Sequence, residues 1–171
     1  YSLWSFSHAV HQTVLKHGLE EGNKVMEAVL ERLCTKLLTP GGEIFIIHFD
    51  SCSDEQRILM KQWAKIWPIL DGTDTQSPSK KIIDATLEKL ESQGDISYKV
   101  AHHVGDPIKY ASESQALEIF LNFHLECVFN QTQLLPNVVK EMRSDFKTYT
   151  GEDGSVSIVP GCFIYEVKRL K

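Results

Sequence analysis

The sequence predicts one α/β domain. Short apolar runs of strand length alternate along the chain with longer segments in which apolar residues recur at helical spacing. Breakers such as TPGG at 39–42 and Gly94 separate these segments. Hydrophobic residues make up 42% of the 171 residues, which is enough for one core. We therefore expect four strands and about five helices in a single domain over residues 1–171.

The first half of the chain predicts a parallel crossover unit. The run YSLWSF at 1–6 is mostly apolar and aromatic, so we expect a strand that passes through a polar elbow at 7–11 into a helix. TPGG ends this helix, and EIFIIHF at 43–49 follows as a strand. The helical spacing is carried by Val25, Met26, Val29, Leu30, Leu33, Leu37 and Leu38. Strand, helix and strand in this order predict two parallel strands joined by a right-handed crossover.

The second half continues the alternation and ends on a strand. We expect a helix over 53–68, capped by Ser53 or Asp54 and ended by Pro68, and a turn-rich loop over 72–81. The remaining expected elements are a helix over 80–94, a strand within 95–107, helices over 112–129 and 135–149, and a last strand within 154–170. Pro160 lies in that strand, so we expect an edge position or a bulge there.

Composition argues against two classes of partner. The net charge is −5 and the basic residues are interspersed with acidic ones, unlike the clustered cations of a nucleic-acid interface. The longest apolar stretches are of strand length, so no spanning helix or membrane partner is expected. The four cysteines lie far apart, at Cys34, Cys52, Cys127 and Cys162. This spacing favours free thiols and a cytoplasmic location.

The chemistry-bearing residues gather at the predicted strand ends. TPGG precedes a strand and therefore is not a phosphate-binding loop. In open α/β sheets ligands bind at the carboxyl ends of strands, which here are 5–8 and 48–50. His8, His11 and His48 could reach one crevice, where they either hydrogen-bond loop carbonyls or act in acid–base catalysis. His102 and His103 face opposite sides of a strand and have no partners at ligand spacing, so no metal site is expected.

Several segments resemble a known family. SFSHAVHQ at 5–12, GGEIFIIHF at 41–49 and the closing strand follow one another as in the C-terminal half of a class I S-adenosylmethionine-dependent methyltransferase. The runs at 116–146, ALEIFLNFHLECVFNQTQLLPNVVKEMRSDF, and at 157–167, SIVPGCFIYEV, are similar to the histamine N-methyltransferase-like family. The likeness covers most of the chain and rests on scattered positions.

The resemblance implies an architecture. It implies a Rossmann-like sheet of which this chain carries strands four to seven, with the last strand antiparallel, flanking helices, and a two-helix insertion at about 112–149. Residues 1–171 would then form the C-terminal part of one methyltransferase-like domain. The N-terminal half of the same domain would precede Tyr1 and would supply the cofactor glycines and the acidic residue that holds the ribose.

The resemblance also implies an activity, which is methyl transfer from S-adenosylmethionine to a nitrogen or oxygen of a small molecule. It assigns His11 as a catalytic base and places Ser5 and Phe6 beside the cofactor. The substrate-binding residues that it implies are Phe6, Val10, Phe49, Asn122 and Val159. Because Phe6 and Val159 stand where the family has amide anchors, the acceptor itself is left open. The alternative is a non-catalytic methyltransferase-like interaction or scaffold domain, and no nucleophile elbow favours a hydrolase.

Overall fold

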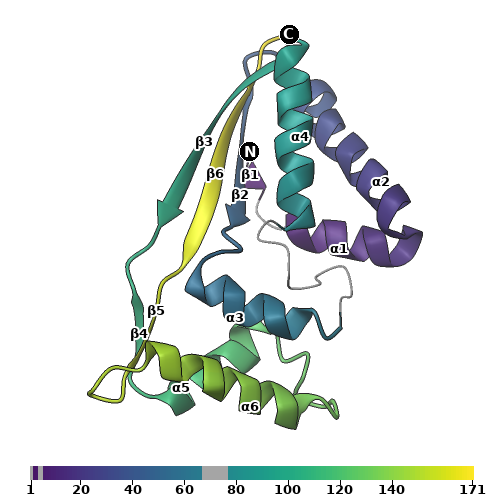
Figure 1. The fold of residues 1–171 in the computed structure, drawn as a ribbon. Coiled ribbons are helices and arrows are strands. Elements are labelled where there is room, and N and C mark those ends of the chain that lie inside the picture. The colour runs from purple at the N-terminus through teal and green to yellow at the C-terminus, as the bar shows by residue number, and fades with distance from the viewer. Residues whose placement is uncertain (1, 4–5, 67–76) are drawn as a thin grey trace. The chain divides into compact units, whose positions relative to one another are not determined.

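The structure is a computed structural model that describes residues 2–3, 6–66 and 77–171. It confirms an α/β fold, with a mixed four-stranded sheet in the order β1-β2-β6-β3, a two-stranded sheet of β4 and β5, and helices (Figure 1). The described residues divide into two compact units. The first unit comprises 2–3, 6–50, 77–103 and 162–171, and the second comprises 51–66 and 104–161.

The first unit contains the four-stranded sheet and three α-helices. Its elements in chain order are β1 (Ser2–Leu3), α1 (Phe6–His17), α2 (Leu19–Arg32), the π-helical turn η1 (Leu33–Leu37), β2 (Glu43–Phe49), α4 (Pro78–Ser92), β3 (Ile96–Val104) and β6 (Gly161–Arg169). β1 pairs in parallel with β2, with Ser2 opposite Phe45. The predicted parallel pairing of the two strands is therefore confirmed, and β2 has the predicted bounds.

The predicted polar elbow at 7–11 is wrong, because these residues are helical. Phe6, which was expected to end the first strand, is the first residue of α1. The physical reason is the spacing of Phe6, Val10 and Val14, which places all three on one buried face of a helix. Of the polar residues between them, His8 and Gln12 are exposed, whereas His11 is buried with the apolar residues. Trp4 and Ser5 lie outside the described residues.

The last strand is antiparallel, as expected, and it lies inside the sheet. β6 pairs with β2 from Glu43 opposite Lys168 to Phe49 opposite Cys162, and β3 is its other neighbour. Pro160 is at neither an edge nor a bulge of one long strand. Instead the predicted strand is split into β5 (Val156–Ile158) and β6, and Pro160 lies between them. Proline has no N–H for a ladder bond, which accounts for the break.

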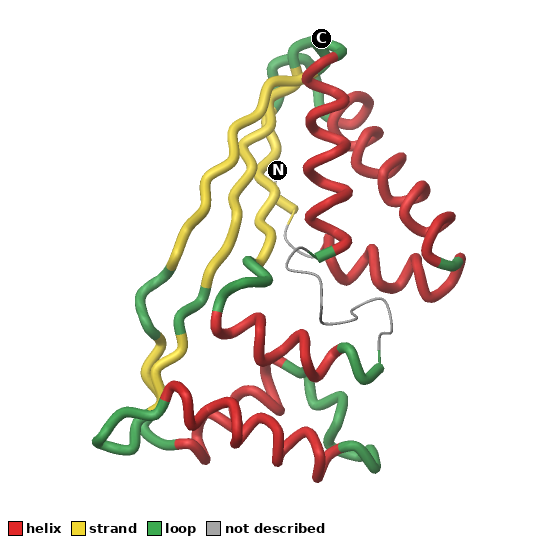
Figure 2. The backbone as a smooth tube through the Cα atoms, in the orientation of Figure 1, coloured by secondary structure: helices red, strands yellow, loops and turns green. Residues whose placement is uncertain are grey.

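The helices α1, α2 and α4 cover one face of this sheet (Figures 1 and 2). Side chains of β2 alternate in burial, so Ile44, Ile46 and His48 are buried while Phe45 and Phe49 are exposed. α4 begins at Pro78, two residues before the predicted start, because Ser77 caps it by accepting a hydrogen bond from the Lys80 backbone N–H at 3.2 Å.

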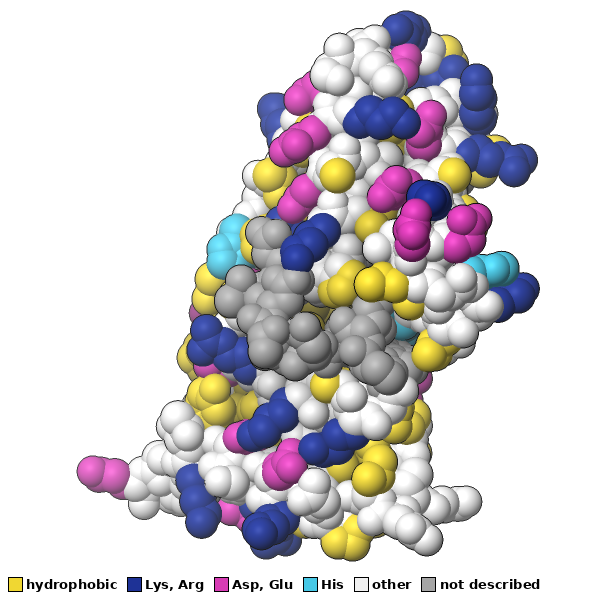
Figure 3. Space-filling model, turned by 45° about the vertical axis from the view of Figure 1, so that its right-hand side comes forward, with side chains coloured by type: hydrophobic (Ala, Val, Ile, Leu, Met, Phe, Trp, Pro, Cys, Tyr) yellow, Lys and Arg dark blue, Asp and Glu magenta, His cyan; other side chains and the backbone are white. Residues whose placement is uncertain are grey.

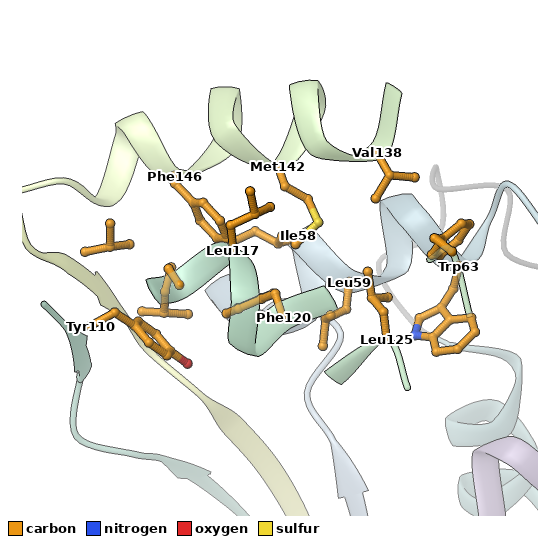
Figure 4. Close-up of a cluster of buried hydrophobic side chains, with 14 residues drawn as sticks. Ile58, Leu59, Trp63, Tyr110, Leu117, Phe120, Leu125, Val138, Met142 and Phe146 are labelled. Atoms are coloured by element: carbon orange, nitrogen blue, oxygen red, sulfur yellow. The ribbon is translucent and has the colours of Figure 1, made fainter. Parts of the chain in front are cut away.

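The second unit is helical around a compact core. Its elements are α3 (Asp54–Trp63), β4 (Ile108–Tyr110), α5 (Glu113–Ile119), the π-helical turn η2 (Phe120–His124), α6 (Leu135–Phe146), the 3-10 turn η3 (Lys147–Tyr149) and β5. Side chains from α3, α5, η2 and α6 meet in the cluster of buried hydrophobic residues that Figure 4 shows. The predicted helix over 112–129 ends early, since Glu126 and Cys127 adopt positive φ angles of 51° and 58°. α3 begins at its predicted cap, Ser53, and ends at Trp63, while Pro68 lies outside the described residues.

The surface charges, the helices and the cysteines bear on the classes of partner that the sequence argues against. On the face that Figure 3 shows, basic and acidic side chains are interspersed. Within the described ranges, no helix is both long and apolar enough to cross a membrane. The four cysteines are free thiols.

Candidate functional site

The candidate site lies in the first unit, where the parallel strands β1 and β2 end. In open α/β sheets this carboxyl edge is where ligands bind. β2 brings His48 and Phe49 to the edge, and Asp50 follows directly. The crossover begins with α1, which carries Phe6 and His11 close to the end of β1.

His48 is fixed in its position by hydrogen bonds from both ring nitrogens. Its Nδ1 lies 2.7 Å from the backbone oxygen of Phe49, and its Nε2 lies 2.8 Å from Ser79 Oγ and 3.1 Å from Ser77 Oγ. A carbonyl only accepts, so Nδ1 carries the proton and Nε2 accepts a hydrogen bond from a serine hydroxyl. Burial lowers the pKa of His48 to about 4, with a smaller effect in the same direction from Lys80. The imidazole is therefore neutral at pH 7.

The pair of Ser79 and His48 has the residue types of a nucleophile and its base, but its surroundings indicate a structural role. Ser79 is fully buried, so a substrate carbonyl has no access to its hydroxyl. The ring nitrogen Nδ1 bonds a backbone carbonyl, where a catalytic triad has a carboxylate. The pair attaches the start of α4 to the end of β2.

His11 belongs to the same neighbourhood. It lies on the buried face of α1, and burial lowers the pKa of its imidazole to about 4, with further lowering by His8 and His48. His8 and His48 thus act electrostatically on His11, and a crevice shared by the three histidines stays a prediction. His8 itself is exposed.

A second histidine pair lies at the same edge, and the sequence did not reveal it. His102 Nε2 is 2.8 Å from Asp50 Oδ2, and the His102 ring stacks on Phe163 with 4.6 Å between ring centres. The carboxylate is largely buried, whereas the His102 side chain is 46% exposed. One signal was present, an acid directly after β2. The partner could not be found, because it depends on the non-local position of β3 in the sheet.

Charged groups of α4 lie against the strands beside this pair. Lys80 Nζ is 2.7 Å from Asp84 Oδ2 and 4.4 Å from the centre of the Phe163 ring. The hydroxyl of Tyr165 donates to Asp84 Oδ1 at 2.6 Å, and burial raises the pKa of Tyr165 far above its usual range. These contacts hold α4 and β6 together under the site.

The predicted site residues fall into both units. In the first unit α1 carries Phe6, Val10 and His11, all buried, and Phe49 is exposed at the end of β2, on the face opposite to His48. Ser5 lies outside the described residues. The other two substrate-binding predictions, Asn122 and Val159, belong to the second unit.

In that unit both residues have hydrogen-bond partners of their own. Asn122 Oδ1 accepts from the side-chain amide of Asn130 at 3.0 Å, and the Val159 backbone N–H donates to Asp54 Oδ2 at 3.3 Å. Asn122 is exposed and Val159 is half-buried. Their role in substrate binding stays a prediction.

A metal centre and a surface pocket are two other kinds of candidate site. Across 2–3, 6–66 and 77–171, no three His, Cys, Asp or Glu side chains are grouped as a metal ion requires. A pocket of about 320 Å³ lies on the sheet near the start of β2 and the end of β6. Its lining includes Glu43, Phe45, Lys99, Glu166 and Lys168, and it contains none of the predicted site residues. It lies at the opposite end of β2 from His48, away from the edge where ligands bind.

A scan against protein-family models matches no family, and a search of curated proteins finds no significant relative. The resemblance to methyltransferases is therefore a prediction from the sequence segments alone.

Proposed function

We propose that the protein is a cytoplasmic, S-adenosylmethionine-dependent methyltransferase that acts on a nitrogen or oxygen of a small molecule, and that this chain carries the substrate side. The observation that carries the proposal is the grouping of neutral imidazoles and aromatic rings at the carboxyl edge of the parallel pair β1 and β2. The antiparallel β6 agrees with the closing strand that the resemblance implies.

The side chains at this edge are compatible with a cationic methyl donor. When bound, S-adenosylmethionine would supply a methyl group on a positively charged sulfur. His11 and His48 are neutral at pH 7 and so do not repel a cation. Asp50 adds a carboxylate nearby, and Phe6 adds an aromatic ring. The printed sequence holds no glycine-rich phosphate motif, so we place the main cofactor loop elsewhere in the polypeptide.

Methyl transfer of this kind depends mainly on alignment of the acceptor lone pair, so proximity supplies much of the rate. His11 suits an orienting role, because a neutral imidazole can accept a hydrogen bond from an acceptor N–H or O–H. With a pKa of about 4 it is a weak proton acceptor at neutral pH, since general bases work best when their pKa is near the operating pH. Phe49 offers exposed aromatic surface at the end of β2.

The decisive test is cofactor binding by the natural polypeptide that contains residues 1–171. We expect a saturable heat of binding with S-adenosylmethionine and transfer of its labelled methyl group to members of a panel of small amines and phenols. A folded protein that gives no heat at millimolar cofactor contradicts the proposal. That outcome would favour the non-catalytic interaction or scaffold domain.

A matched pair of variants tests the position of the acceptor. Phe49 and Phe45 lie on the same face of β2 with 43% and 41% exposure, but only Phe49 is at the carboxyl edge. Phe49→Ala is expected to raise the KM for the acceptor by about 10- to 150-fold, because burying an aromatic side chain against a ligand contributes about 1.5–3 kcal/mol. Phe45→Ala is the control and should leave the KM unchanged. Equal effects would place the acceptor elsewhere.

A further inference from the structure

The pairing of His102 with Asp50 has the form of an acid–base dyad. Asp50 is held at the end of β2 with its side chain only 11% exposed, and its Oδ2 is 2.8 Å from His102 Nε2. The His102 ring is stacked on Phe163 with an interplanar angle of 18°. A buried carboxylate and an aromatic ring thus orient an imidazole that is half exposed to solvent.

This geometry determines which ring nitrogen can accept a proton. A carboxylate accepts hydrogen bonds, so His102 Nε2 carries the proton and the lone pair of the neutral ring is on Nδ1. When Nδ1 takes a second proton, the Asp50 carboxylate stabilises the imidazolium that forms, as in other carboxylate–histidine pairs. The exposed part of the ring can then pass the proton to water.

We propose that His102, oriented by Asp50, takes up the proton that the substrate atom loses when this atom receives the methyl group. This inference rests on the proposed function and adds a residue to it. As methylation places positive charge on an amine nitrogen, its N–H bond breaks with the electron pair kept by nitrogen while an N–H bond forms at His102 Nδ1. Asp50 is a positioning residue in this scheme, and His11 keeps the orienting role.

The groups around the dyad come from each neighbouring element. From α4, the Lys80 ammonium lies over the Phe163 ring that also stacks on His102, and it is paired with Asp84. From the strands, the Asp50 carboxylate raises the pKa of His48, against the larger lowering by burial, and the Tyr165 hydroxyl donates a hydrogen bond to Asp84. Lys80 is paired with Asp84 at 2.7 Å, and Asp50 is the charged group whose hydrogen-bond distance to His102 is 2.8 Å.

The first experiment measures which ring nitrogen of His102 carries the proton, and it needs no cofactor. Nitrogen-15 NMR of the histidine rings distinguishes a proton on Nε2 from one on Nδ1. We expect the Nε2–H form for His102 in the wild-type protein and a mixture of both forms in Asp50→Asn, whose side chain no longer holds a negative charge. A His102 ring that carries its proton on Nδ1 in the wild type would overturn the proposal. His103→Gln removes the neighbouring signal and assists the assignment.

The second experiment measures methyl transfer by the full polypeptide. His102→Gln is expected to lower kcat about 100-fold, within the usual contribution of a general base, and to leave the KM for S-adenosylmethionine unchanged. Free imidazole should restore part of the activity of His102→Ala, which a merely structural residue would not allow. His103→Gln is the matched control, since it lies next to His102 on the other face of β3 and should retain wild-type kcat.

The outcomes separate the two proposals. If the wild type transfers methyl groups and His102→Gln is equally fast, the proton-acceptor role is overturned while the proposed function stands. If the wild type neither binds nor uses S-adenosylmethionine, both proposals are overturned. If His102→Gln is slow but imidazole does not rescue His102→Ala, the loss of activity is structural, and this outcome also contradicts the role proposed for His102.

Discussion

The buried side chains at the carboxyl end of β2 in the first unit are largely polar, whereas the second unit is built around a cluster of 14 buried hydrophobic residues (Figure 4). The polar set of the first unit comprises His11, His48, Asp50, Ser77, Ser79 and Thr86. The second unit buries polar side chains as well, among them Glu55, whose carboxylate lies 3.4 Å from His124 Nδ1. What distinguishes the first unit is that its buried polar side chains include His48 and Asp50 at the carboxyl end of β2, where ligands bind in open α/β sheets.

The reason lies in the cost of burying polar groups. A buried polar group destabilises a fold unless it is hydrogen-bonded, so its presence requires a specific arrangement of partners. His48 has such partners on both ring nitrogens, and Asp50 has His102. A hydrophobic cluster requires only close packing, so it provides stability without chemistry. Substitutions in each unit can test whether the two differ in this way.

The largest effect is expected in the hydrophobic cluster. Phe120 is fully buried, and its ring makes edge contacts with Tyr110 and Phe146 at 6.0 and 5.2 Å between centres. Phe120→Ala should lower the free energy of unfolding by about 3–5 kcal/mol, because it leaves a cavity. Urea denaturation measures the change. Phe123→Ala is the control, since Phe123 is 75% exposed in the same π-helical turn, and it should cost less than about 0.5 kcal/mol.

The next effect belongs to the polar site and depends on pH. The pKa of His48 is lowered from 6.5 to about 4 by burial, so below pH 6.5 the unfolded chain takes up a proton that the folded chain does not. Stability present above pH 6.5 is therefore lost as the pH falls toward 4, by about 3 kcal/mol for this residue. Urea unfolding of the wild type and of His48→Gln between pH 7 and 4.5 tests this. Parallel curves for the two proteins would contradict it.

A smaller effect concerns the contact between α2 and α1, the helix that carries His11. A Cβ at Gly22 of α2 would lie 2.7 Å from Val14 Cα of α1, so Gly22→Ala should separate the two helices. We expect a loss of about 1–3 kcal/mol from overpacking, although alanine favours a helix over glycine by about 1 kcal/mol. Thermal or urea unfolding shows whether the free energy of unfolding falls or rises. Glu21→Ala, at an exposed position of the same helix, should change stability by less than about 0.5 kcal/mol.

Local signals in the sequence predicted much of this fold. The strand Glu43–Phe49 is bounded by a glycine turn and an acid, and its limits were predicted to the residue. The predicted start of α1 was wrong, because the small and imidazole side chains at 7–11 resemble a polar loop. The four-residue spacing of Phe6, Val10 and Val14 is the signal that indicates the helix. The split at Pro160 was underestimated for a similar reason, since the apolar run on both sides of it reads as one strand.

The candidate site was predictable only in part. His48 lies near the end of a strand that is visible in the sequence, whereas His11 lies in α1, whose start the sequence did not indicate. The pairing of Asp50 with His102 joins residues on elements that are far apart in the chain. It exists because β6 lies between β2 and β3, and this sheet order is set by tertiary packing, which no local pattern encodes.

The smallest effect compares one serine from each unit. Ser53 caps α3 and Ser77 caps α4, each by accepting a backbone N–H three residues later, at 3.3 and 3.2 Å. Loss of either cap should cost about 1 kcal/mol. Ser77 Oγ also lies 3.1 Å from His48 Nε2. In urea denaturation, Ser77→Ala should therefore lower the free energy of unfolding by about 0.5–1.5 kcal/mol more than Ser53→Ala does. In a His48→Gln background this excess should shrink, because the partner imidazole is gone. Equal costs for the two serines in the wild-type background would show that Ser77 is only a helix cap, and that the polar network at the end of β2 does not extend to it.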